Sequence, residues 1–225
     1  MEVEFTISAS GVLVSVDFDD TAGLDIEPGF EEITDYIHHI AVVVPNEVTH
    51  IADRAFYDKR WLTGITIPNG VLSIGDDAFT DCNYLQSVAL PDSLISLGER
   101  AFAYCDISTI DIPIGVTHLP RRVFYGCPSL ETVFLAGGVT HIGEEAFAHC
   151  DQLTALTLPE SVTHIGESAF QACSALENVI VENENAIIAD TAFEDCDASL
   201  TLHGKQGSAA EHFARAHGLQ FSPIQ

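Results

Sequence analysis

Apolar residues recur along most of this chain with a period of 22 or 23 residues. A phenylalanine marks each copy, and alanine precedes it in every copy but one; the seven phenylalanines are Phe56, Phe79, Phe102, Phe124, Phe147, Phe170 and Phe193. An isoleucine or leucine stands five residues before each of them, and in six copies a cysteine stands three residues after. Agreement at this many positions predicts seven structural copies of one unit that stack on one another.

A second pattern fills the interval between each cysteine position and the next copy. Examples are "LQSVALP" from Leu85 and "LTALTLP" from Leu153, with apolar residues at the first, fourth and sixth places. The alternation in the last three places predicts a short half-buried strand, and the proline that follows ends it. This is the L-x-x-L-x-L spacing of leucine-rich repeats, and the period lies in their range of about 20 to 29 residues.

The residues between the strands sharpen the comparison. They read "VTHIGEEAFAHC" from Val139 and "VTHIGESAFQAC" from Val162. This form resembles the BspA-type, or Treponema-type, leucine-rich repeat from about Pro45 to Cys196. The resemblance implies a right-handed solenoid with a stack of short parallel strands and little helix. It also implies that "VTxI" forms a second short strand or extended run on another side of the coil.

Both ends depart from the template. "EFTIS" and "VLVSVDF" predict a hairpin around Ser10 and Gly11, and residues 23–33 and 40–51 suggest a degenerate first repeat. Near the other end Ser208 can cap a helix that Gly218 ends, in a segment that resembles the family's closing cap. We therefore expect one continuous solenoid domain: an N-terminal β cap with a degenerate repeat (1–45), six to seven repeats (46–197) and a C-terminal helical cap (198–225).

The charge is strongly one-sided, with 34 acidic residues against 8 lysines and arginines and a formal net charge of −26. Such a surface repels phosphate backbones and anionic membranes, so we expect neither nucleic-acid binding nor membrane insertion, whereas a cationic protein partner would suit it. No uninterrupted apolar stretch approaches the length of a membrane span. The sequence shows no signal peptide, which predicts a cytoplasmic protein as written. The family resemblance suggests the cell surface or secretion if the N-terminus was trimmed.

The cysteines and histidines are the candidates for chemistry. Each of the six cysteines falls at one repeat position, and no C-x-x-C pair occurs, so we expect reduced, buried thiols that fill the core. His118, His141 and His164 hold one position in three consecutive copies and should face solvent. Three such imidazoles are candidate ligands for Zn²⁺ or Cu²⁺, or a pH-responsive group, or polar residues copied with the repeat. The acidic cluster around Asp17, Asp19 and Asp20 lacks the spacing of an EF-hand, and solvated charge is the favoured interpretation.

The outward face of the strand stack is the candidate binding surface. Its middle positions include Asp111, Phe134, Thr157 and Ile180, and Phe134 and Ile180 are the sizeable apolar side chains among mostly small ones. Exposed aromatic residues on such a face are plausible contact points. Trp61 and Tyr84, in the turns before two strands, form a second candidate patch unless they pack locally over the turn.

No motif of a catalytic site or cofactor site is present. The sequence thus predicts a non-catalytic scaffold that binds another protein and uses no cofactor, and the resemblance implies that this binding can be surface adhesion. Two alternatives stay open. One is a self-assembling structural module, and the other is a metal-binding or pH-responsive protein that uses the histidine ladder.

Overall fold

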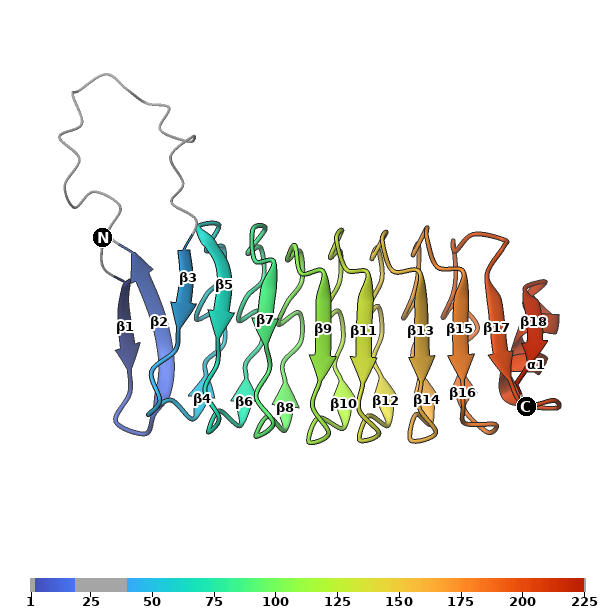
Figure 1. Ribbon diagram of the computed structural model, residues 1–225, viewed down its shortest axis with the longest axis horizontal. Helices are drawn as coiled ribbons and strands as arrows, with labels where there is room; N and C mark the ends of the chain where they lie inside the picture. The colour runs from blue at the N-terminus through green and yellow to red at the C-terminus, as the bar shows by residue number, and fades with distance from the viewer. Residues whose placement is uncertain (1–2, 19–39, 225) are drawn as a thin grey trace, which may run out of the picture.

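The computed structural model describes residues 3–18 and 40–224 and shows an elongated β-solenoid of about eight turns (Figure 1). The predicted leucine-rich solenoid is therefore confirmed. Each coil has three sides: a strand of up to five residues, a strand of two residues, and the segment that carries the Ala-Phe pair. The division at residues 45/46 and 197/198 stays a prediction, and the expectations for residues 23–33 and for Asp19 and Asp20 lie outside the described residues.

The first side is a parallel stack that we call the long-strand ladder. Its strands form three hydrogen-bonded groups, β3-β5-β7, β9-β11 and β13-β15-β17-β18. Side chains alternate between core and solvent along each strand, as in the buried and exposed sequence of β13. The strands are β3 (Ile40–Val43), β5 (Leu62–Thr66), β7 (Ser87–Ala89), β9 (Thr109–Ile112), β11 (Thr132–Leu135), β13 (Ala155–Leu158), β15 (Asn178–Val181), β17 (Thr201–Gly204) and β18 (Gln220–Pro223).

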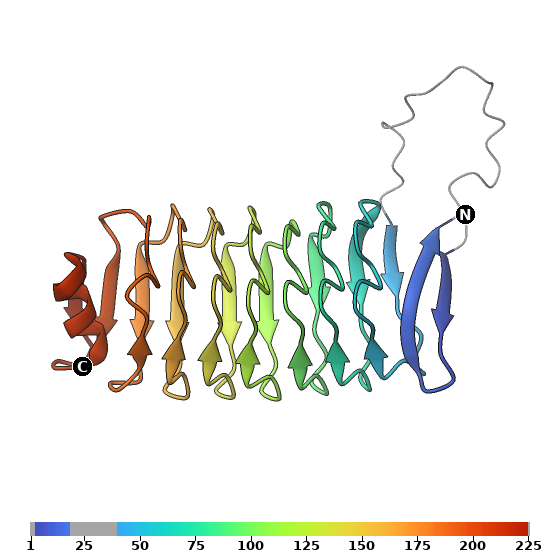
Figure 2. The ribbon, with the colours of Figure 1, turned by 180° about the vertical axis from the view of Figure 1, so that it is seen from behind.

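The second side, which is nearer the viewer in Figure 2, is the short-strand ladder that the "VTxI" segments form. In most of its two-residue strands the first residue faces outward and the second is buried in the core, as with His141 and Ile142. The predicted hairpin of β1 (Val3–Ile7) and β2 (Val12–Phe18) joins this ladder, because β2 pairs in parallel with β4. The other strands are β4 (His50–Ile51), β6 (Ser73–Ile74), β8 (Ser96–Leu97), β10 (His118–Leu119), β12 (His141–Ile142), β14 (His164–Ile165) and β16 (Ile187–Ile188).

The third side, the Ala-Phe side, is an irregular run held by hydrogen bonds between coils. The residues two before and two after each phenylalanine mostly have positive φ, as Glu145 (54°) and His149 (60°) show around Phe147. These left-handed residues turn the backbone so that alternate N–H groups point along the solenoid axis. The N–H of Phe147 therefore donates to the Ala169 carbonyl of the next coil at 2.8 Å. The phenylalanine rings stack in the interior with centroids 4.7–5.7 Å apart.

The C-terminal cap is the helix α1 (Ala209–His217) followed by β18. The Ser208 hydroxyl accepts a hydrogen bond from the Glu211 N–H, and Gly218, at φ 71°, closes the helix with its N–H on the Ala214 carbonyl. Both capping residues are those that the sequence predicted. The helix buries Ala210, Phe213 and Ala214, and Phe213 meets Phe193 edge-on at 5.7 Å, so the stack of rings ends under the cap.

Candidate functional site

Four of the predicted binding residues form one row across the outward face of the long-strand ladder. Asp111 of β9 lies in register with Phe134 of β11, and Thr157 of β13 lies in register with Ile180 of β15. The Phe134 side chain is 59% exposed, Asp111 and Thr157 are exposed, and Ile180 is half-buried. The alternation of each strand places these side chains outward, because their neighbours on both sides belong to the core.

A hollow interrupts this face between β11 and β13, the two neighbouring strands at which one hydrogen-bonded group ends and the next begins. It encloses about 370 Å³ and is lined by Thr132, Phe134, Ala155, Thr157, Pro159 and Glu182, among others. An exposed aromatic ring beside a hollow with an acidic rim is suited to an apolar side chain from a partner, with a cation nearby.

Trp61 and Tyr84 lie apart from this row, in the turns that precede β5 and β7. The Trp61 side chain is half-buried and packs against the core, while Tyr84 is 41% exposed. The structure does not bring them to the hollow. Both therefore stay candidate contacts, with more of Tyr84 than of Trp61 open to solvent.

The three predicted histidines come together on the short-strand ladder as a stack of parallel rings. The centroids of His118 and His141, and of His141 and His164, are 4.5 Å apart, with interplanar angles of 15° and 5°. Each Nδ1 lies 2.8–2.9 Å from the hydroxyl of the threonine before it. Parallel rings direct their nitrogens along parallel lines, not toward one point as a metal site needs. Within residues 3–18 and 40–224 no group of three or more potential ligands is placed to hold a metal ion.

The middle histidine differs from its neighbours in exposure. His141 is half-buried between two rings, whereas the sequence predicted that all three face solvent; His118 and His164 do. Burial lowers the pKa of His141 below its usual value of 6.5, and the charges that His118 and His164 would carry lower it further. The stack therefore disfavours full protonation, although each ring sits at the surface.

Sequence reasoning missed a cluster of arginine and tyrosine on the Ala-Phe side. Arg54, Arg100, Arg122, Tyr57, Tyr104 and Tyr125 line a hollow of about 360 Å³. Arg100 holds Asp77 through two hydrogen bonds of 2.7 and 2.8 Å, and Arg122 holds Glu145 at 2.5 and 3.0 Å. These bonds lower the pKa of both carboxyl groups. The signal was present in the sequence, because the position two before the phenylalanine holds either arginine or an acidic residue in the first five copies.

The family model for the BspA type leucine rich repeat region matches six copies in this chain, over residues 49–177 and 84–201. The chain belongs to the BspA-type leucine-rich repeat family. Leucine-rich repeat proteins generally act as scaffolds that bind other proteins. A search of the curated proteins found no match.

Solved structures of leucine-rich repeat proteins resemble this chain. The chain is 25% identical to a leucine-rich repeat protein from Bacteroides ovatus (TM-score 0.56), covering 82% of this chain and 60% of that one. It is 26% identical to one from Eubacterium ventriosum (TM-score 0.64), covering 71% and 43%. The T. pallidum leucine-rich repeat protein shares the fold at 21% identity (TM-score 0.51), with 97% and 94% covered. This chain thus spans only part of the length of the first two relatives. In the described ranges no helix has the length and apolar character to cross a membrane.

Proposed function

We propose that this BspA-type solenoid is a non-catalytic scaffold that binds a partner protein on the outward face of the long-strand ladder, centred on Phe134. The observation that supports this most is the aromatic ring itself: it is 59% exposed and lines a hollow on this face. Leaving such a ring in water has a cost of roughly 1.5–3 kcal/mol relative to burying it. A partner that covers the ring recovers this free energy.

The chemistry around Phe134 indicates what the partner presents. Asp111 lies beside it on β9, and Glu182 lies at the far side of the hollow. An apolar side chain of the partner would enter the hollow, and lysine or arginine beside it would meet these carboxylates. The net charge of −26 extends the same preference over the whole molecule, because it raises the rate of encounter with a cationic surface.

The finer part of the proposal is adhesion: the partner is presented outside the cell, and this chain acts at the cell surface. It follows from the family resemblance, and antibody labelling of intact against permeabilised native cells tests it. Labelling of intact cells is expected, and labelling only after permeabilisation would overturn this part while leaving the scaffold role open.

Site-specific photo-crosslinking tests the binding face. We would place p-benzoylphenylalanine at Thr157, which lines the hollow, and at Glu99, which is exposed outside the long-strand ladder. Exposed to extracts and surface fractions of the native cell, the Thr157 probe is expected to form one defined adduct. That adduct should vanish when Phe134→Ser is added, and the Glu99 probe should not form it. Equal yields at the two positions would contradict the proposed face.

A further inference from the structure

In every interior coil, two backbone N–H groups of the Ala-Phe side donate to the coil that follows: that of the phenylalanine and that of the residue two later. In the coils of Phe56 to Phe147 the N–H two residues before the phenylalanine donates as well, as from Glu145 to the Glu167 carbonyl. In the last such pair Phe170 donates to the Ala192 carbonyl at 2.8 Å and Ala172 donates to the Glu194 carbonyl at 2.9 Å. The same pairing recurs from the coil of Phe56 onward, so each coil presents the next with the same two donors.

In the last coil the two equivalent N–H groups have no acceptor in the described part of the chain. Phe193 and Asp195 hold the two donor positions, and Asp195 has the left-handed φ of 59° that aims its backbone as in the other copies. No acceptor for either N–H is found among residues 3–18 and 40–224. The chain instead continues into β17 and α1, and Phe213 of the cap meets Phe193 edge-on. Phe193 is buried, and an unpaired backbone donor at a buried position has a cost of about 1–3 kcal/mol, whereas Asp195 is an exposed residue. This edge is therefore suited to an acceptor from outside.

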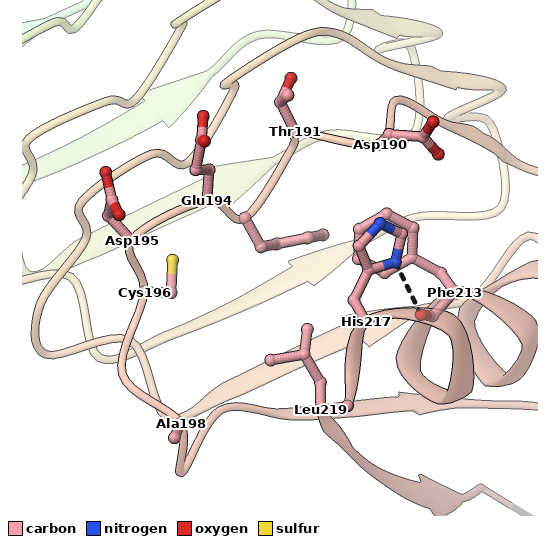
Figure 3. A pocket seen from close by; sticks show the side chains of 11 residues that line it. Asp190, Thr191, Glu194, Asp195, Cys196, Ala198, Phe213, His217 and Leu219 are labelled. Carbon is pink, nitrogen blue, oxygen red and sulfur yellow. Dashed lines mark hydrogen bonds between the residues drawn. The ribbon is translucent and has the colours of Figure 1, made fainter.

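A cavity of about 410 Å³ lies beside this open edge (Figure 3). Its apolar lining includes Phe193, Phe213 and Leu219, the last of these following the helix cap at Gly218. Figure 3 shows the side chains of the last coil on one side of the cavity and those of the cap helix on the other. The ring of His217 is already engaged: it stacks on Phe213 at 4.0 Å, and its Nδ1 donates to the Phe213 carbonyl at 3.0 Å.

The rim of the cavity is acidic. Asp190, Glu194 and Asp195 line it and are exposed. None of the three forms an ion pair with a lysine, arginine or histidine in the described part of the chain. Elsewhere the solenoid does pair acids with arginine, as between Glu145 and Arg122. The rim thus offers three carboxylates to a cation that the chain itself does not supply.

We propose that this end of the solenoid is a second binding site, for an extended segment of a partner protein that carries lysine or arginine next to an apolar residue. Two carbonyls of the segment, two residues apart, accept from the N–H groups of Phe193 and Asp195, as the next coil would. An apolar side chain enters the cavity, and the basic side chains meet the acidic rim. Two donors at this spacing match alternate carbonyls of an extended backbone, which is how strand addition recognises a peptide. The site is separate from the long-strand face and does not depend on it.

The probe is the capped peptide acetyl-Lys-Leu-Lys-Leu-Lys-amide, with acetyl-Glu-Leu-Glu-Leu-Glu-amide as its matched control. Titration into ¹⁵N-labelled full chain should shift the amide signals of Phe193 and Asp195 and slow their hydrogen exchange. Phe170 and Ala172, whose N–H groups are already bonded, should change little. Ala198→Trp, which fills the cavity from an exposed position, should weaken binding at least tenfold. The double variant Asp190→Asn with Glu194→Gln should also weaken it, and this variant carries the test if Ala198→Trp does not fold.

Two control variants locate the effect. Glu131→Gln with Glu160→Gln removes the same charge at exposed positions outside the cavity, and Phe134→Ser alters the long-strand face. Both should bind the peptide as the unaltered chain does. Shifts spread over the whole acidic surface, or equal weakening by both charge variants, would overturn the proposal. So would concentration-dependent dimerisation that Ala198→Trp abolishes, because a second copy of the chain would then be the occupant.

Discussion

The cysteine of each repeat acts as a hydrogen-bonded filler between coils. The Cys150 thiol, for example, lies 3.2 Å from the Phe124 carbonyl of the coil before, and the other five thiols contact the equivalent carbonyl. All six are free, five of them are buried, and Cys196 is half-buried. Burial raises the pKa of Cys82 and Cys127 to about 12, which suppresses the reactive thiolate.

A thiol reagent used at pH 8 without reductant therefore distinguishes the folded chain from the unfolded one. Folded protein should react slowly, with Cys196 the first to be modified because it is the least buried and its pKa is raised only to about 11. In unfolded protein all six thiols should react with the reagent at once. Fewer than six in denaturant would show disulfides, and fast modification of several thiols in the folded state would contradict the assigned packing.

The histidine stack makes a pH-dependent prediction at His141. Its folded pKa is lowered while its unfolded pKa is near 6.5, so below pH 6.5 the unfolded state binds more protons and the folded state loses stability. Titration of the His141 ring signals by NMR should give a midpoint below 6.5. The double variant His118→Ser with His164→Ser removes the neighbouring charges and should raise that midpoint. A midpoint that does not move would exclude coupling within the stack.

At the scale of elements, the cap helix depends on its first turn. Ser208 is buried and accepts from the Glu211 N–H, while the Glu211 carboxylate accepts from the Gly207 N–H at 2.5 Å. Ser208→Ala removes the first of these bonds and should lower the free energy of unfolding by about 1 kcal/mol in a urea titration. Ser174→Ala, at an exposed serine, serves as the control and should change it by less than about 0.5 kcal/mol. Equal effects would show that the cap does not limit stability.

The repeating elements were predictable because each signal recurs in several copies. The strand after the cysteine and the helix between Ser208 and Gly218 follow from local pattern, whereas the two-residue strand at "VTxI" was implied by the family resemblance. The hollow beside Phe134 was not predictable, because it depends on where hydrogen bonding between β11 and β13 lapses, and no residue type marks that point. The unpaired N–H groups of Phe193 and Asp195 were not predictable for a similar reason. Their sequence matches the interior copies, and only the path of the following chain leaves them without an acceptor.

The pairing of histidine rings was foreseen in position but not in geometry. The repeat period places His118, His141 and His164 side by side, which the sequence predicted. The bonds from each Nδ1 to the preceding threonine hydroxyl orient the rings face to face. That orientation depends on side-chain geometry, which the repeat pattern alone does not reveal. It is also what distinguishes this stack of parallel rings from a metal site, in which the nitrogens converge on one point.

For the whole molecule, charge opposes folding. A net charge of −26 on a single solenoid creates self-repulsion that the few arginine–acid pairs do not cancel. Raising NaCl from about 10 mM to about 100 mM shortens the screening length from about 30 Å to about 10 Å. The unfolding temperature should therefore rise, and KCl should have the same effect because the cause is screening. A fall in unfolding temperature would mean that ion pairs such as Arg122 with Glu145 outweigh the repulsion.

The central claim for the whole molecule is that the long-strand face holds the partner. It is tested most directly by the dissociation constant of the crosslinked partner for two variants matched in exposure: Phe134→Ser (59% exposed) and Ile187→Ser on the short-strand ladder (60% exposed). Phe134→Ser should weaken binding at least tenfold, which corresponds to about 1.4 kcal/mol, and Ile187→Ser should leave it within about twofold. Unchanged binding by Phe134→Ser, or equal loss in the two variants, would contradict the account.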